Sequence, residues 1–172
     1  PFRWLLAQTI ARRRAPLARG IYAQIGGGSP ILAQTQAQAA ALEAELADLG
    51  DVKIFIAMRY WHPRAALAAE KVRAFGPDKV VLLPLYPQYS TTTTASSVSE
   101  WEKVSFGMTA PVAVIGCYPS EPWFTLAHVQ AITPLVEEAR KIGPPRILFS
   151  AHGLPKRISD DGDPYAGQTE RT

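Results

Sequence analysis

The sequence predicts an α/β fold, a Rossmann-like, doubly wound parallel sheet with helices on both faces. Four short apolar runs are nearly continuous rather than alternating, which is typical of strands buried on both faces. Segments with helical spacing separate these runs, and short loops connect them, as in repeated βαβ units. A chain of 172 residues is long enough for about one such domain.

The four predicted strands are rich in β-branched and other apolar residues. They cover residues 52–56, 80–83, 112–115 and 147–149. Because each run is short and apolar throughout, we expect all four to belong to one buried parallel sheet.

Helices are predicted before and between the strands. Apolar residues recur every three or four positions in each of them, and the last three stop before a glycine. The patterns cover residues 4–14, 42–49, 68–75 and 121–142. Pro134 is expected to kink the last helix, because proline removes a backbone donor.

Composition and charge exclude several classes of protein. The chain is 47% hydrophobic and 19% charged, as in soluble globular domains. No apolar run approaches the roughly 18 residues of a membrane-spanning helix. A net charge of +3 is too small to predict a nucleic-acid partner. Cys117 is the only cysteine, so no internal disulfide can form, and we expect a cytoplasmic protein.

Common nucleotide-binding and catalytic patterns are missing. The glycine-rich segment 26–31 precedes the first predicted strand, and Ile31 stands where a dinucleotide fingerprint needs glycine. Ile31 also breaks the nucleophile elbow of serine hydrolases. The sequence contains no Gly-Lys pair, no HExxH and no CxxC. A nucleotide-binding, hydrolytic or zinc-dependent function is therefore disfavoured.

Polar and aromatic residues follow the predicted strands at their carboxyl ends, where open parallel sheets bind ligands. These segments are Met58–Pro63, Tyr86–Ser90, Cys117–Pro119 and Ser150–Pro155. Together they would form an aromatic-walled pocket with one arginine and one imidazole, suited to a large planar ligand that carries carboxylates. The alternative, that the aromatic side chains only pack, stays open.

The three histidines differ in their predicted surroundings. His152 follows a predicted strand, in a turn of small residues that exposes its imidazole to the pocket. An imidazole with a pKa of about 6.5 accepts protons near neutral pH. His62 is expected at a helix cap, because Pro63 suits a first helical position. His128 lies on the apolar stripe of the last helix, which favours a packing role. His152 is therefore the functional candidate.

Several segments resemble the ferrochelatase family in their order and spacing. They are Ile25–Ile31, Met58–Pro63, Leu83–Ser90, Phe149–Pro155, Asp163–Tyr165 and Gln168-Thr169. The resemblance covers nearly the whole chain. It implies two similar Rossmann-like halves with a porphyrin in the cleft between them. Residues 1–145 would then be the N-terminal half without its first strand, and residues 146–172 the truncated start of the second.

The same resemblance implies a lyase that inserts Fe²⁺ into protoporphyrin IX in the last step of haem biosynthesis. His152 matches the active-site histidine of the family, assigned as iron ligand or as acceptor of pyrrole protons. Pocket positions that hold the macrocycle or the incoming metal are matched by Arg59, Tyr60, Tyr86 and Ser90. Iron is a substrate in this reaction, so no resident cofactor is expected.

The sequence also departs from the family. The glutamate that partners the active-site histidine lies beyond Thr172, and we expect a fragment, because the chain begins at Pro1 rather than methionine. Ala23 and Gln24 stand where animal members have two arginines. Thr91 stands where those members place a cysteine ligand of an iron–sulfur cluster, so such a cluster is not expected.

Three other functions stay open at this point. A related enzyme could act on coproporphyrin III or insert cobalt into a precorrin-type ring. A non-catalytic module could bind a tetrapyrrole without metal insertion. A nucleotide-binding Rossmann domain is the least favoured. Oligomeric state and peripheral contact with a membrane are left open.

Overall fold

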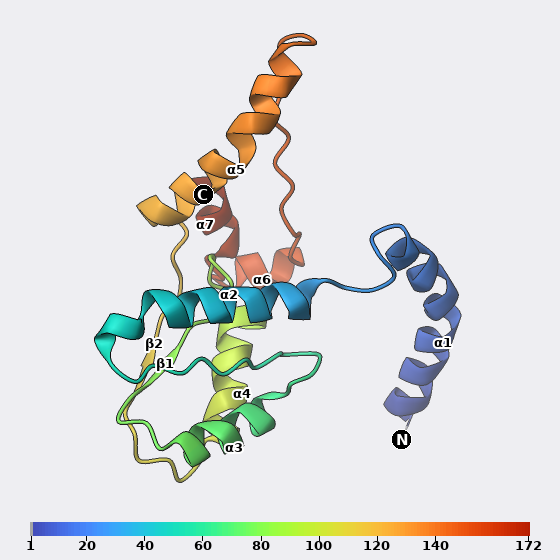
Figure 1. Ribbon diagram of the computed structural model, residues 1–172. Helices are drawn as coiled ribbons and strands as arrows, with labels where there is room; N and C mark the ends of the chain where they lie inside the picture. Colours follow the sequence, from blue (N-terminus) through green and yellow to red (C-terminus); the bar gives the residue numbers. More distant parts are fainter. Residues whose placement is uncertain (1) are drawn as a thin grey trace. The chain divides into compact units, whose positions relative to one another are not determined.

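The computed structural model describes residues 2–172, and the chain divides into two compact units (Figure 1). The first unit ends at Ile56 and the second begins at Ala57. Every site residue predicted from the sequence, from Arg59 to His152, belongs to the second unit. The expected boundary at residue 145, between two halves of a longer protein, stays a prediction.

Helices make up most of the described part of the first unit. Helix α1 spans Phe2–Ala23, helix α2 spans Ile31–Glu45, and the 3-10 turn η1 spans Ala47–Leu49. The helix predicted at residues 4–14 is confirmed and is longer than expected. Gly50 ends η1 with a φ of 125°, a backbone conformation that glycine adopts without strain.

The prediction of a strand at residues 52–56 was wrong, because these residues form an irregular segment. The segment is joined to α2 by an ion pair of 2.7 Å between Lys53 Nζ and Glu43 Oε1. An apolar run becomes a strand only where another strand accepts its backbone hydrogen bonds. Within the first unit, the described residues offer no such partner.

The second unit contains the sheet. Strands β1 (Val80–Leu82) and β2 (Val112–Val114) lie side by side and run parallel, with Val80 opposite Val112 (Figure 1). Helix α4 (Ser96–Val104) lies between them in the sequence. A strand, a helical crossover and a parallel strand make a βαβ unit, so the α/β class is confirmed.

The strand predicted at residues 147–149 is also wrong for the described chain, where it is irregular. Leu148 and Phe149 are 85% and 86% exposed, and in residues 2–172 only β1 and β2 pair with each other. The sequence pattern was that of a strand covered on both faces. No described element covers this segment, so neither the pairing nor the burial that a strand needs is present.

The best-buried apolar residues lie where helix α3 (Ala65–Phe75) packs against α4. Ala68, Ala69 and Val72 of α3 are buried, and so is Trp101 of α4. The predicted stripe of α3 is therefore confirmed at Ala68 and Val72. Because α3 begins at Ala65, with Arg64 as its cap, the expectation that Pro63 starts the helix and His62 caps it was wrong.

Three helices complete the second unit: α5 (Pro122–Arg140), α6 (Lys156–Asp160) and α7 (Tyr165–Arg171). Helix α5 confirms the predicted helix and starts at a cap, where Glu121 Oε2 accepts a hydrogen bond from the amide of Phe124. Its apolar stripe is largely exposed, with Leu135 71% accessible. Within residues 2–172, no helix has the length and apolar character needed to cross a membrane.

Candidate active site

The candidate residues come from three loops of the second unit. Arg59 and Tyr60 precede α3, Tyr86 and Ser90 follow β1, and His152 lies between α5 and α6. The loops after β1 and β2 are joined, since the amide of Tyr118 donates to the carbonyl of Pro87 over 2.8 Å. The carboxyl ends of the two parallel strands therefore meet at one edge, as the sequence predicted.

Arg59 is held by helix α4. Its Nη1 lies 2.8 Å from Glu100 Oε2, and its Nε donates to Ser96 Oγ over 3.3 Å. Arg64 Nη2 donates to the other carboxylate oxygen of Glu100 over 3.1 Å. One carboxylate thus receives two guanidinium groups, which leaves the cluster with a net positive charge.

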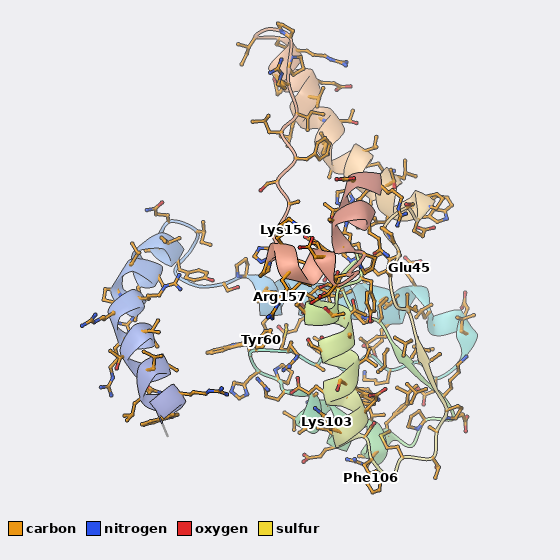
Figure 2. All side chains as sticks on the ribbon, turned by 180° about the vertical axis from the view of Figure 1, so that it is seen from behind. Glu45, Tyr60, Lys103, Phe106, Lys156 and Arg157 are labelled. Carbon is orange, nitrogen blue, oxygen red and sulfur yellow. The ribbon has the colours of Figure 1, made fainter. Side chains whose placement is uncertain are left out.

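Tyr60 extends its ring outward from the loop before α3 (Figure 2) and is 74% exposed. The guanidinium carbon of Arg59 lies 4.8 Å from the centre of this ring, within the range of a cation–π contact. Trp61 is exposed beside it, and its ring meets that of His62 edge to face at 5.8 Å. The loop therefore presents an open aromatic surface next to a cationic group.

Ser90 is fully buried and begins the π-helical turn η2 (Thr91–Ala95), which continues into α4. Its hydroxyl accepts a hydrogen bond from the amide of Thr92 over 3.1 Å and donates to Asp163 Oδ2 over 2.9 Å. π-Helical turns are rare in proteins, and those that occur often lie at functional sites. Ser90 therefore fixes the start of this turn, and its side chain does not line the exposed surface of the site.

Asp163 binds the same turn from the far end of the chain. Its Oδ2 accepts from both the amide and the hydroxyl of Thr91 at 2.7 Å, and its Oδ1 accepts from the amide of Tyr165 at 3.0 Å. Desolvation raises the pKa of Asp163, but hydrogen bonds from Thr91, Tyr165 and Ser90 outweigh it and hold the pKa below its ordinary value.

Tyr86 is half-buried in the loop after β1, and its hydroxyl has no hydrogen-bond partner among the described residues. The hydroxyl of the neighbouring Tyr118 donates to the carbonyl of Pro84 over 3.4 Å. Burial raises the pKa of Tyr118. Tyr118 therefore stays neutral near pH 7 and offers ring surface and a hydroxyl rather than charge.

His152 is exposed, and in the part of the chain that the structure describes its imidazole makes no hydrogen bond or ion pair. Both ring nitrogens are therefore accessible to a proton or a metal ion. By contrast, the Nδ1 of His128 contacts the carbonyl of Phe124 at 2.9 Å on α5, and its ring packs on Phe124. Over residues 2–172, no three His, Cys, Asp or Glu side chains gather to form a metal site.

The structure thus joins Arg59 to α4 and Ser90 to Asp163, but it shows no contact between His152 and the other candidates in residues 2–172. Sequence reasoning missed the roles of Asp163, Glu100 and Gln168, the last of which accepts a hydrogen bond from the amide of Tyr89 at its Oε1 over 2.7 Å. The position of Asp163 two residues before a helix start is a sequence signal for a carboxylate that binds backbone amides. Glu100 and Gln168 act through contacts distant in sequence and carry no local signal.

Comparison with known proteins identifies the family. The chain matches the ferrochelatase family model over residues 1–172. A ferrochelatase of Wolbachia sp. subsp. Drosophila simulans is 50% identical over 176 residues, which cover 100% of this chain and 56% of that protein. For the ferrochelatase of Hyphomonas neptunium the identity is 50%, with coverage of 99% and 48%. For that of Caulobacter vibrioides NA1000 it is 49%, with coverage of 99% and 50%.

The chain spans about half the length of these curated relatives. The match nevertheless extends from the first residue to the last and includes all five candidate residues. The chain belongs to the ferrochelatase family.

Proposed function

We propose that the full-length protein carrying this chain inserts Fe²⁺ into protoporphyrin IX and releases protohaem and two protons. The observation that carries this proposal is the family match over residues 1–172, with curated relatives near 50% identity that are named ferrochelatase. The absence of a resident metal cluster is part of the proposal, because iron enters the reaction as substrate.

His152 is proposed as the acceptor of pyrrole protons or as a ligand of the incoming iron. Metal insertion requires two N–H protons to leave the macrocycle, and a neutral imidazole can accept one of them and pass it to solvent before it accepts the second. The free ring nitrogens of His152 support this role, since no described group competes for them.

Tyr60, Tyr86 and Arg59 are proposed to hold the macrocycle. The exposed ring of Tyr60 and the half-buried ring of Tyr86 offer apolar surface to a flat ligand. The net positive charge of the Arg59, Arg64 and Glu100 cluster favours a propionate. Ser90 is buried, and we propose that it acts indirectly, by fixing the turn η2 that follows the loop of Tyr86. Side chains that hold the porphyrin in a bent conformation lower the activation free energy of metal insertion by about 1–5 kcal/mol.

We also infer that the Rossmann-like, doubly wound sheet extends beyond β1 and β2 in the full-length protein. The apolar run at residues 147–149 has the sequence of a covered strand but is exposed here. The relatives are about twice as long as this chain, so their remaining length supplies residues that can cover it. We also propose that the protein is cytoplasmic, as its single cysteine, Cys117, led us to expect.

The test is anaerobic metal insertion by the purified full-length protein. Fe²⁺ and protoporphyrin IX are mixed, and loss of porphyrin fluorescence is followed with the absorbance of haem. We expect turnover in the wild type, loss of turnover with retained porphyrin binding in His152→Ala, and wild-type behaviour in His128→Ala, the matched control on α5. Turnover retained in His152→Ala would overturn the role of His152.

The same assay separates the alternatives. Coproporphyrin III at equal concentration, and Co²⁺ in place of Fe²⁺, report which porphyrin and which metal the enzyme prefers. A shift of the Soret band without metal insertion under any of these conditions would contradict the enzyme and favour a tetrapyrrole-binding module.

A further inference from the structure

The carboxylate of Asp163 is the most highly coordinated side chain at the candidate site. Its Oδ2 accepts three hydrogen bonds from two consecutive residues, the hydroxyl of Ser90 and the amide and hydroxyl of Thr91, over 2.7–2.9 Å. Asp163 lies 72 residues after Thr91 in the sequence. The contact therefore joins two distant parts of the second unit at the residue where η2 begins.

We propose that Asp163 is a positioning residue, which locks the loop carrying Tyr86 and Ser90 to the segment carrying His152. The proposal rests on the proposed function, because it assigns Asp163 a part in the alignment of porphyrin and imidazole. Asp163 touches neither of them. It acts through Ser90 and Thr91 on one side and through its own chain, eleven residues after His152, on the other.

A second set of hydrogen bonds joins the same two parts of the chain. The amide of Tyr89 donates to Gln168 Oε1 over 2.7 Å, and Gln88 Nε2 donates to Thr172 Oγ1 over 2.9 Å. Residues 163–172, which we call the strap, thus bind consecutive positions of the loop before η2. In both views α6 and α7 lie beside the start of α4 (Figure 1; Figure 2).

The turn held by the strap is costly on its own. In the described chain the buried hydroxyls of Thr93 and Thr94, both in this turn, have no hydrogen-bond partner. Buried polar groups without partners destabilise a fold, and π-helical geometry is itself uncommon. The charged hydrogen bonds of Asp163 offset part of this cost, which explains why a carboxylate stands here.

An amide cannot replace this carboxylate. Oδ2 faces the amide of Thr91, while Oδ1 accepts from the amide of Tyr165. An asparagine has one oxygen and one NH₂ group, so one of these two backbone donors would face another donor. Asp163→Asn therefore loses one of these two backbone contacts in either orientation and keeps only a neutral acceptor for the other, whereas Asp163→Glu keeps two charged acceptor oxygens.

The test uses the full-length protein and measures three quantities: kcat and KM for metal insertion, the Kd for protoporphyrin IX by fluorescence quenching, and amide hydrogen exchange of residues 88–95. For Asp163→Asn we expect faster exchange at Thr91, a fall in kcat of about 10- to 100-fold, and a Kd within about threefold of the wild type. Asp163→Glu should recover part of kcat.

The matched control is Asp160→Asn, which removes a neighbouring carboxylate. Within residues 2–172 this carboxylate pairs only with Lys156, on the exposed face of α6. We expect this variant to match the wild type in all three measurements. Thr91→Val removes one donor and keeps the backbone amide, so it should lower kcat less than Asp163→Asn does. It replaces Asp163→Asn as the test if that variant does not fold.

Unchanged exchange and unchanged kcat in Asp163→Asn, or in Thr91→Val where it stands in, would overturn the lock. Equal losses of kcat in Asp163→Glu and Asp163→Asn would also overturn it, because the second oxygen would then have no role. If the wild type binds porphyrin but inserts no metal, the proposed function fails, and with it the catalytic part of this proposal. Hydrogen exchange still decides whether the contact holds the loop.

Discussion

The guanidinium of Arg59 lies 2.8 Å from the carboxylate of Glu100, which is 41 residues later in the chain and also accepts a hydrogen bond from Arg64. The contact ties the aromatic loop before α3 to α4. Ser90 begins η2, and η2 leads directly into α4. The same helix is therefore linked to the loop of Arg59 and Tyr60 and to the loop of Tyr86 and Ser90. Arg59, which we propose as a contact of a porphyrin propionate, is thus also part of the scaffold of the site.

Replacing Glu100 by glutamine should loosen this loop. The change leaves two guanidinium groups with a neutral partner, and we expect a loss of about 1 kcal/mol in the free energy of unfolding, because the groups are partly exposed and screened by solvent. The loss should shrink in 1 M salt. Urea unfolding at low and high salt measures both effects.

Glu138→Gln is the control for Glu100→Gln. Glu138 pairs with Lys141 on the surface of α5, where both side chains are more than 60% exposed. Such pairs contribute little, so the unfolding midpoint should stay unchanged. If Glu100→Gln were as neutral as this control at low salt, the contact with Arg59 would have no structural role.

Local sequence patterns were sufficient to predict helices α1, α3 and α5 and the paired strands β1 and β2. The helix expected at residues 42–49 meets only the end of α2 and η1, and α6 and α7 were not predicted. Ala68 and Val72 mark the buried face of α3, and Gly76 ends it with a φ of 68°. Val80 and Val112 fall inside the two paired strands. These features depend on neighbours within a few residues or on a single apolar run, which a sequence displays directly.

Features that depend on distant partners could not be read in this way. The run at residues 147–149 looks like a buried strand, but Phe149 is exposed because no described element covers it. The helix α4 was not predicted, and Trp101 became its buried anchor only through packing on α3. At the site, the segments that contain Arg59 and Ser90 were identified because they follow predicted strands, of which the one before Arg59 is absent, and the resemblance to ferrochelatases implied the pocket role of both residues. Their partners Glu100 and Asp163 are set by tertiary contacts.

Gln168 should contribute to stability mainly through one hydrogen bond to a backbone amide, beside a longer one of 3.8 Å from its Nε2 to Cys117 Sγ. It is buried, and its Oε1 accepts from the amide of Tyr89 over 2.7 Å. Gln168→Leu fills a similar volume but leaves that amide without a partner, and we expect a loss of about 1–3 kcal/mol in the free energy of unfolding. Urea unfolding followed by circular dichroism measures it.

Gln130→Leu provides the comparison, because Gln130 lies exposed on α5. Its effect should stay within about 0.5 kcal/mol. A similar small effect at Gln168 would show that the amide of Tyr89 finds another partner, such as water, and that the strap is held by Asp163 and by the hydrogen bond between Gln88 and Thr172.

Gly76 should resist replacement for reasons of backbone geometry alone. It ends α3 in the left-handed conformation, and its amide donates to the carbonyl of Val72. A Cβ at this position would meet no atom within 4 Å, so Gly76→Ala tests conformational strain without a clash. We expect a loss of about 1 kcal/mol in the free energy of unfolding.

Gly116→Ala is the matched change, since Gly116 also has open space around its Cβ position but does not have a positive φ. That variant should be neutral or slightly more stable, because alanine restricts the unfolded chain. Equal destabilisation by both changes would point to a packing effect that the open space around Gly76 does not predict.

Asp163 should make stability depend on pH in the acid range. Its pKa in the folded protein is below the ordinary value, so its hydrogen bonds stabilise the fold fully above the ordinary aspartate pKa of 3.8. This stabilisation is lost as the pH falls through the ordinary value and then through the lower folded one. The wild type should therefore lose stability below about pH 4, and Asp163→Asn should lose less over the same range.

The difference between the two proteins isolates Asp163 from the other carboxylates, which titrate in both. Urea unfolding between pH 7 and pH 2.5 should give a difference in unfolding free energy that is constant at the upper end and narrows below the ordinary pKa. Asp160→Asn should differ from the wild type by little at every pH, because its exposed pair with Lys156 is screened. A difference for Asp163→Asn that stayed constant down to pH 2.5 would mean that the charge of the carboxylate does not hold Ser90 and Thr91.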